Sequence, residues 1–143
     1  MSVTVDTNVL LYAANTDDDL HERARELLER LAQGPDLLYL FWPTIMGFLR
    51  IATHPAIFPE PSSPKHAMAT IGALLARPNI RTPGETSGFW DVYEATASED
   101  TRGNHVPDAH LATLMRQHGV RVVYTRDRDL RRYGGIEARD PFA

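Results

Sequence analysis

The stretch Val3–Ala13, VTVDTNVLLYA, decides the class of fold in this sequence. Its first residues are β-branched and apolar, as in a buried strand, and a helical pattern follows almost at once. In an open α/β sheet, side chains at the carboxyl ends of the strands line the crevice where ligands bind. Asp6 stands at such an end, so we expect an α/β fold and a functional role for this carboxylate.

Strand and helix patterns continue to alternate along the chain. Besides a first strand over residues 3–6, extended patterns cover residues 37–42, 79–81, 120–125 and 136–138. Helical patterns cover residues 8–13, 20–31, 43–52, 65–77, 86–100 and 107–118. Asn8 is suited to cap the first helix, and the proline-rich segment 54–66 predicts a loop. Strands separated by helices predict a single domain over residues 1–143 with a mainly parallel sheet.

Composition restricts the class of protein. With 143 residues, of which 43% are hydrophobic and 24% charged, the chain is typical of a globular domain with one core. No apolar stretch approaches the roughly 20 residues of a membrane span, and the N-terminal segment does not resemble a signal peptide. Because the chain has no cysteine, disulfides and thiolate chemistry are excluded. We therefore expect a cytoplasmic protein without a membrane partner.

The charge balance gives mixed indications about nucleic acid. The formal net charge is −4, whereas domains that bind nucleic acid are usually basic. However, 14 of the 15 lysine and arginine residues are arginine, whose planar fork suits phosphate. Many acids also gather in residues 16–30, which read as a solvated helix. RNA therefore remains a possible substrate, with Arg50, His54 and Arg102 as candidate contacts.

Two further acids stand at junctions similar to that of Asp6. Asp127 follows the strand pattern of residues 120–125, and Asp108 follows Pro107 at the start of a helical pattern. Carboxylates gathered in one crevice repel one another, and a hard divalent cation is the usual way to keep them ionised. The three acids together therefore predict a divalent-metal site that cleaves phosphodiester bonds.

Each of these acids also has a purely structural explanation. Asp6 is a favoured helix cap, and an acid in the first helical turn, such as Asp108, interacts well with the helix dipole. Asp127 and Asp129 stand among arginines in an expected turn, where they can form ion pairs with Arg126, Arg128 or Arg131 on the surface. Taken singly, none of the three acids establishes a metal site.

Histidine and aromatic residues point to structural roles. His105 and His110 are five residues apart, and no pair of histidines has the i, i+4 spacing of a helical zinc motif. We therefore predict no transition-metal site from the histidines. Phe89, Trp90 and Tyr93 form an aromatic stripe, which we assign to the core rather than to a surface that stacks on bases.

Four segments resemble, in order, the PIN domain family, and more narrowly the VapC-type ribonuclease toxins of bacterial toxin–antitoxin pairs. They are DTNVLLYA at 6–13, WPTIMGFLRIATHP at 42–55, GNHVPDAHLATL at 103–114 and TRDRDL at 125–130. Each motif is short, but together they extend over nearly the whole chain. The resemblance implies a PIN-like three-layer α/β/α domain with a mainly parallel central sheet.

The resemblance also implies an activity and partners. It implies an endoribonuclease that depends on Mg²⁺ or Mn²⁺, forms a homodimer and is inhibited by a small VapB-type antitoxin. By position, Asp6, Asp108 and Asp127 match the metal ligands and catalytic acids. The residues expected to support this site are Thr7, Asn8, Asn104, Thr125 and Asp129. In the implied mechanism, metal-activated water attacks the phosphate in line and leaves a 5′-phosphate.

One position departs from the pattern of the family. A glutamate usually follows four residues after the proline of the segment that matches WPTIMGFLR, and Gly47 stands there. Losing a carboxylate weakens metal affinity. An alternative function is therefore a PIN-fold module that binds RNA or an antitoxin with impaired catalysis. A phosphotransfer fold fits less well, because Asn8 replaces a required second acid and the only lysine, Lys65, is not late in the chain.

Overall fold

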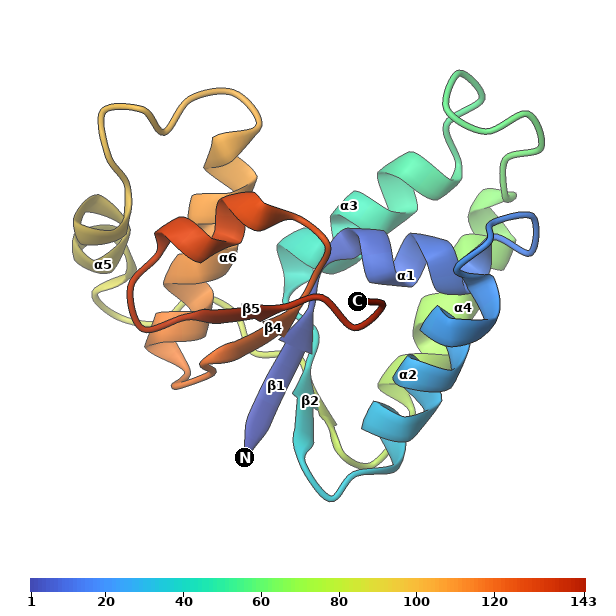
Figure 1. Ribbon diagram of the computed structural model, residues 1–143, viewed down its shortest axis with the longest axis horizontal. Helices are drawn as coiled ribbons and strands as arrows, with labels where there is room; N and C mark the ends of the chain where they lie inside the picture. Colours follow the sequence, from blue (N-terminus) through green and yellow to red (C-terminus); the bar gives the residue numbers. More distant parts are fainter.

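A computed structural model describes residues 1–143 as one five-stranded sheet covered by helices on both faces (Figure 1). The strands are β1 (Ser2–Val5), β2 (Leu37–Tyr39), β3 (Ile80–Arg81), β4 (Val122–Tyr124) and β5 (Glu137–Arg139). They lie in the order β3-β2-β1-β4-β5, and every neighbouring pair is parallel. The expected three-layer α/β class with a parallel sheet is confirmed.

The alternation of side chains along the strands, seen most clearly in β4, explains why the sheet has a core on each face. Val3 and Val5 are buried in the larger apolar cluster, together with Leu38 of β2 and Val122 of β4. Val123, one residue further along β4, belongs instead to a second cluster on the opposite face. A strand that is apolar on both faces is typical of a parallel sheet covered by helices.

The helices form the two outer layers. Their bounds are α1 (Thr7–Ala14), α2 (His21–Gln33), α3 (Trp42–Ala52), α4 (Pro64–Leu75), α5 (Phe89–Thr96) and α6 (His105–Gln117). In Figure 1, α1 to α4 lie on one side of the sheet, and α5 and α6 lie on the other. A short 3-10 helix, η1 (Arg128–Arg132), packs against α6. None of the helices is both long and apolar enough to cross a membrane.

Three details of the sequence-based predictions were wrong. The helix expected over residues 86–100 is shorter, and Trp90 in it is 63% exposed and stacks on Tyr93 rather than entering the core. Asn8 lies exposed inside α1, because Asp6 is the residue that caps this helix. The segment after β4, expected as a turn, forms η1.

Asn79 ties together three elements at the end of the sheet opposite to Asp6. Its side-chain Nδ2 donates hydrogen bonds to the carbonyl oxygen of Leu31 in α2, at 3.0 Å, and to that of Asp36 before β2, at 2.7 Å. Asn79 itself directly precedes β3. Replacing it by alanine leaves both carbonyl groups without this partner.

We therefore expect Asn79→Ala to lower the free energy of unfolding by about 1–3 kcal/mol. Urea unfolding followed by circular dichroism measures this difference. Gln33→Ala is the matched control, because it removes only an exposed hydrogen bond to Glu29 and should change the free energy by less than about 0.5 kcal/mol. Equal stabilities of the two variants would contradict a structural role for Asn79.

Candidate active site

The pairing of β1 with β4 brings the first and last predicted acids to one edge of the sheet. Val5 is in register with Tyr124, and the backbone N–H of Asp6 donates to the carbonyl oxygen of Tyr124 at 3.0 Å. The residues that follow the two strands, Asp6 and Thr125, therefore lie side by side. This is the carboxyl edge of the parallel sheet, where α/β folds bind their ligands.

Asp6 is held by two hydrogen bonds, one to each carboxylate oxygen. Oδ1 accepts from the backbone N–H of Thr7 at 2.7 Å, which makes Asp6 the N-cap of α1. Oδ2 accepts from the hydroxyl of Thr125 at 2.9 Å, and Thr125 is buried. Each oxygen retains a lone pair for a further partner. The capping explanation for Asp6 is thus correct, and it leaves the carboxylate able to bind a ligand.

Asp127 is oriented by the same threonine. Its backbone N–H donates to the Thr125 hydroxyl at 2.9 Å, so this hydroxyl joins Asp6 to the loop after β4. Asp127 Oδ1 accepts from the backbone N–H of Asp129 at 2.8 Å and caps η1. Neither Asp127 nor Asp129 forms an ion pair with an arginine, so the structural explanation proposed for this turn is wrong.

Asp108 joins the cluster from the first turn of α6. Its side chain is 18% exposed, and Oδ2 lies 3.9 Å from Nδ1 of His105, which precedes it by three residues on the same helix. The same Nδ1 lies 3.9 Å from Oδ2 of Asp129. The structure thus brings the three predicted acids together with Thr125, Asp129 and His105.

The electrostatics show that this cluster lacks positive charge. Burial, together with the nearby carboxylates of Asp127, Asp6 and Asp129, raises the pKa of Asp108 to about 6, against a smaller opposing effect of His105. Burial also raises the pKa of Asp6, although its hydrogen bonds from Thr125 and Thr7 act in the opposite direction. A cation bound among the carboxylates would favour their ionised forms.

The donor atoms fit a divalent cation. Carboxylate oxygens are the preferred ligands of Mg²⁺. Four carboxylates lie near one another here, those of Asp108, Asp6, Asp127 and Asp129. His105, Asp108 and Asp129 each place one ligand atom within 4.8 Å of the others. His105 was not among the predicted site residues. Its spacing of three from Asp108 was the available signal, since residues three apart share one face of a helix.

Other predicted residues lie beside the acids or apart from them. The hydroxyl of Thr7 donates to the carbonyl oxygen of Thr44 in α3, at 3.3 Å, and thereby links the two helices. Asn8 and Asn104 are exposed, and their side chains form no hydrogen bond with the acids. The candidate RNA contacts are also exposed and form no ion pair with the cluster; they are Arg50, His54 and Arg102.

Gly47 lies where α3 approaches α1. A Cβ atom at this position would stand 3.1 Å from Oγ1 of Thr7, the residue that follows Asp6. A side chain at position 47 would thus project toward the acid edge and would require a small displacement of Thr7. Thr7 therefore occupies part of the space that a side chain at position 47 would enter.

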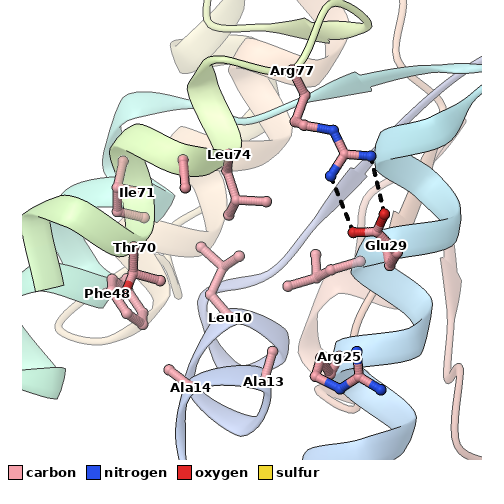
Figure 2. Close-up of a pocket in the computed structure, with 12 residues that line it drawn as sticks. Leu10, Ala13, Ala14, Arg25, Glu29, Phe48, Thr70, Ile71, Leu74 and Arg77 are labelled. Carbon is pink, nitrogen blue, oxygen red and sulfur yellow. Dashed lines mark hydrogen bonds and ion pairs between the residues drawn. The ribbon is translucent and has the colours of Figure 1, made fainter. Parts of the chain in front are cut away.

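One apolar cavity of the molecule is separate from the acids. It lies between α1, α2 and α4, has a volume of about 290 Å³ and is lined by residues such as Leu10, Ile71 and Leu74 (Figure 2). At its rim, the guanidinium of Arg77 donates to both carboxylate oxygens of Glu29 at 3.1 Å. No acid of the cluster lines this cavity, so the cavity is not part of the candidate site.

Comparisons with known proteins agree with this fold. A family model described as PIN domain matches residues 3–136. Ribonuclease VapC48 of Mycobacterium tuberculosis is 44% identical over 144 residues, covering 100% of this chain and 99% of the relative.

Solved structures extend the comparison. The crystal structure of VapC20 from Mycobacterium tuberculosis, described as a toxin that cleaves the sarcin-ricin loop, aligns with a TM-score of 0.68 at 20% identity over 92% of this chain and 95% of that one. The crystal structure of VapBC2 from Rickettsia felis, bound to promoter DNA, aligns with a TM-score of 0.69 at 14% identity over 97% of this chain and 98% of that one. From the sequence match and the shared architecture, the chain belongs to the PIN domain family and, within it, to the VapC group.

Proposed function

We propose that this protein is a divalent-metal-dependent endoribonuclease and the toxin of a toxin–antitoxin pair. The observation that carries the proposal is the convergence of Asp6, Asp108 and Asp127, from three distant parts of the chain, on the carboxyl edge of the sheet. The whole-length similarity to a protein named ribonuclease supports the same activity.

Asp6, Asp108 and Asp127 are the residues that would hold Mg²⁺ or Mn²⁺. When bound, the ion supplies a Lewis acid that lowers the pKa of water and stabilises negative charge on the scissile phosphate. Thr125 supports the site by fixing the orientation of Asp6 and of the Asp127 loop. Supporting roles for Thr7, Asn8, Asn104 and Asp129 remain proposals.

Asp127 is also suited to move a proton. Its Oδ1 is occupied by the hydrogen bond from Asp129, whereas Oδ2 accepts no hydrogen bond from the chain. We assign to Oδ2 the acceptance of a proton from the attacking water, within the reach that general-base catalysis requires. In-line attack would then break the bond between phosphorus and the 3′ oxygen. The upstream fragment would end in a 3′-hydroxyl and the downstream fragment would carry the 5′-phosphate.

RNA is the proposed substrate, and an antitoxin is the proposed protein partner. The exposed side chains of Arg50, His54 and Arg102 are the proposed phosphate contacts. The VapBC2 structure supports an inhibitor of VapB type. A homodimer is proposed from the resemblance to VapC-type toxins alone. An RNA substrate also agrees with the expected cytoplasmic location.

The alternative of a binding module with impaired catalysis rests on Gly47 alone. A relative that shares 44% of residues over the full length is named a ribonuclease, and this comparison gives the alternative no support.

We expect Gly47→Glu to leave the rate constant of RNA cleavage within about threefold of the wild-type value, since the other donors remain in place. Single-turnover RNA cleavage measures it. A gain of more than about tenfold would show that the missing acid limits the enzyme.

Loss of one proposed ligand should abolish cleavage. We expect Asp6→Asn and Asp127→Asn each to lower the rate of RNA cleavage by about a hundredfold or more in the presence of Mg²⁺ or Mn²⁺, because each loses a metal ligand or proton acceptor. Asp91→Asn is the control, as Asp91 is an exposed acid on α5 and should leave the rate unchanged. Equal cleavage by the wild type and Asp6→Asn would refute the metal mechanism.

The raised pKa of Asp108 makes the metal-free protein less stable as the pH increases. The folded protein holds the proton up to a pH of about 6, whereas the unfolded chain releases it near 3.8. Between these values the folded state binds more protons, so stability falls as the pH rises. Asp6, whose pKa is also raised, contributes in the same direction.

We therefore expect Asp108→Asn to be about 1–3 kcal/mol more stable than the wild type at a pH of about 7.5 in EDTA, and of nearly equal stability below a pH of about 4. Urea unfolding at both pH values tests this expectation. Mg²⁺ should stabilise the wild type and have little effect on the variant. A variant less stable than the wild type at the higher pH would show that ionisation of Asp108 does not destabilise the folded protein.

A further inference from the structure

Two buried polar side-chain atoms have no hydrogen-bond partner, and both belong to the surroundings of Asp108. They are Nδ1 of His105 and the hydroxyl of Tyr133. Tyr133 is 4% exposed, and the Asp108 carboxylate is near enough to contribute to the raised pKa of this tyrosine. Buried polar atoms are nearly always paired, so an unpaired atom indicates a missing partner such as an ion or water.

Nδ1 of His105 lies between two carboxylates, at the outer limit of ion-pair distance and beyond the reach of a hydrogen bond. It lies 3.9 Å from Oδ2 of Asp108 and 3.9 Å from Oδ2 of Asp129, which is too far for a hydrogen bond in either case. Two ligand atoms that bind one ion at about 2.0–2.2 Å can be at most about 4.4 Å apart. Both separations from Nδ1 fall within this limit, and the two carboxylate oxygens lie no more than 4.8 Å apart, which is at most slightly above it.

Two elements set this geometry independently of each other. His105 and Asp108 share one face in the first turn of α6, where residues three apart are neighbours. Asp129 comes from η1, whose start is capped by Asp127. The atoms thus converge from the helix and from the loop after β4 without a bond between them.

We propose that His105 is a nitrogen ligand of the divalent-metal site, acting with Asp108 and Asp129, and that it shifts the preference of the site from Mg²⁺ toward Mn²⁺. This inference rests on the proposed metal-dependent function, whose oxygen ligands include Asp108. Imidazole is a poor ligand for Mg²⁺ and a good one for transition metals, so one nitrogen in the set discriminates between the two ions.

The other histidine of α6 provides the contrast. Nε2 of His110 donates to the carboxylate oxygen Oε1 of Glu85 at 2.7 Å, and the ring makes an edge contact with that of Phe89. It is therefore satisfied by neighbours of its own, on the α5 side of the helix. His105 lacks such a partner, which is why its nitrogen is available to a metal.

The experiment uses the full chain without a polyhistidine tag and Mn²⁺ as the probe. Pulsed electron paramagnetic resonance detects a coordinated imidazole through the coupling of its ¹⁴N nucleus to Mn²⁺. We expect this coupling in the wild type and in His110→Leu, and its loss in His105→Leu. The dissociation constant of Mn²⁺ should rise on the order of tenfold or more in His105→Leu, and that of Mg²⁺ by less than about threefold.

Asp129→Asn tests the same site without altering the histidine. This variant should bind Mn²⁺ more weakly and still show the ¹⁴N coupling, and it keeps the inference testable if His105→Leu does not fold. Wild-type protein that binds Mn²⁺ with no ¹⁴N coupling would overturn the role of His105 and leave the proposed function standing. Wild-type protein that binds neither ion would overturn both.

Discussion

The parallel pairing of β1 with β4 is the constraint on which the site depends. Val3 and Val5 are buried in one apolar cluster, and a shift of register by one residue would turn both toward the other face. The register is therefore held by the core itself. It places Asp6 beside Thr125, whose single hydroxyl then connects Asp6 to Asp127. Core packing thus positions two of the carboxylates before any ligand is bound.

This arrangement brings together groups that repel one another. Asp6 and Asp108 have raised pKa values because they are buried near other carboxylates, which opposes folding of the ionised protein. Hydrogen bonds from Thr7 and Thr125 offset part of this effect at Asp6 but none of it at Asp108. None of these acids belongs to either apolar core.

The sequence predicted those features that depend on local pattern. Periodicity located every α-helix and strand but not the 3-10 helix η1, and the junction positions of Asp6, Asp108 and Asp127 predicted their convergence. The sequence did not predict that Trp90 of α5 would be exposed. An aromatic stripe does not show which of its side chains contacts the core. His105 was missed for a related reason. Its partner Asp129 lies 24 residues later in the chain, and only tertiary structure brings the two together.

The absence of a carboxylate at position 47 and the presence of His105 concern opposite sides of the same cluster. On the α3 side, Gly47 leaves Thr7 in the space toward which a glutamate would project. On the α6 side, His105 and Asp129 add two ligand atoms around Asp108. If His105 binds the ion as proposed, it supplies a donor in place of the one that position 47 lacks, and the ligand set changes from all-oxygen to mixed nitrogen and oxygen. A metal site can lose one carboxylate and remain competent if another element supplies a donor, and here α6 and η1 are the elements placed to do so.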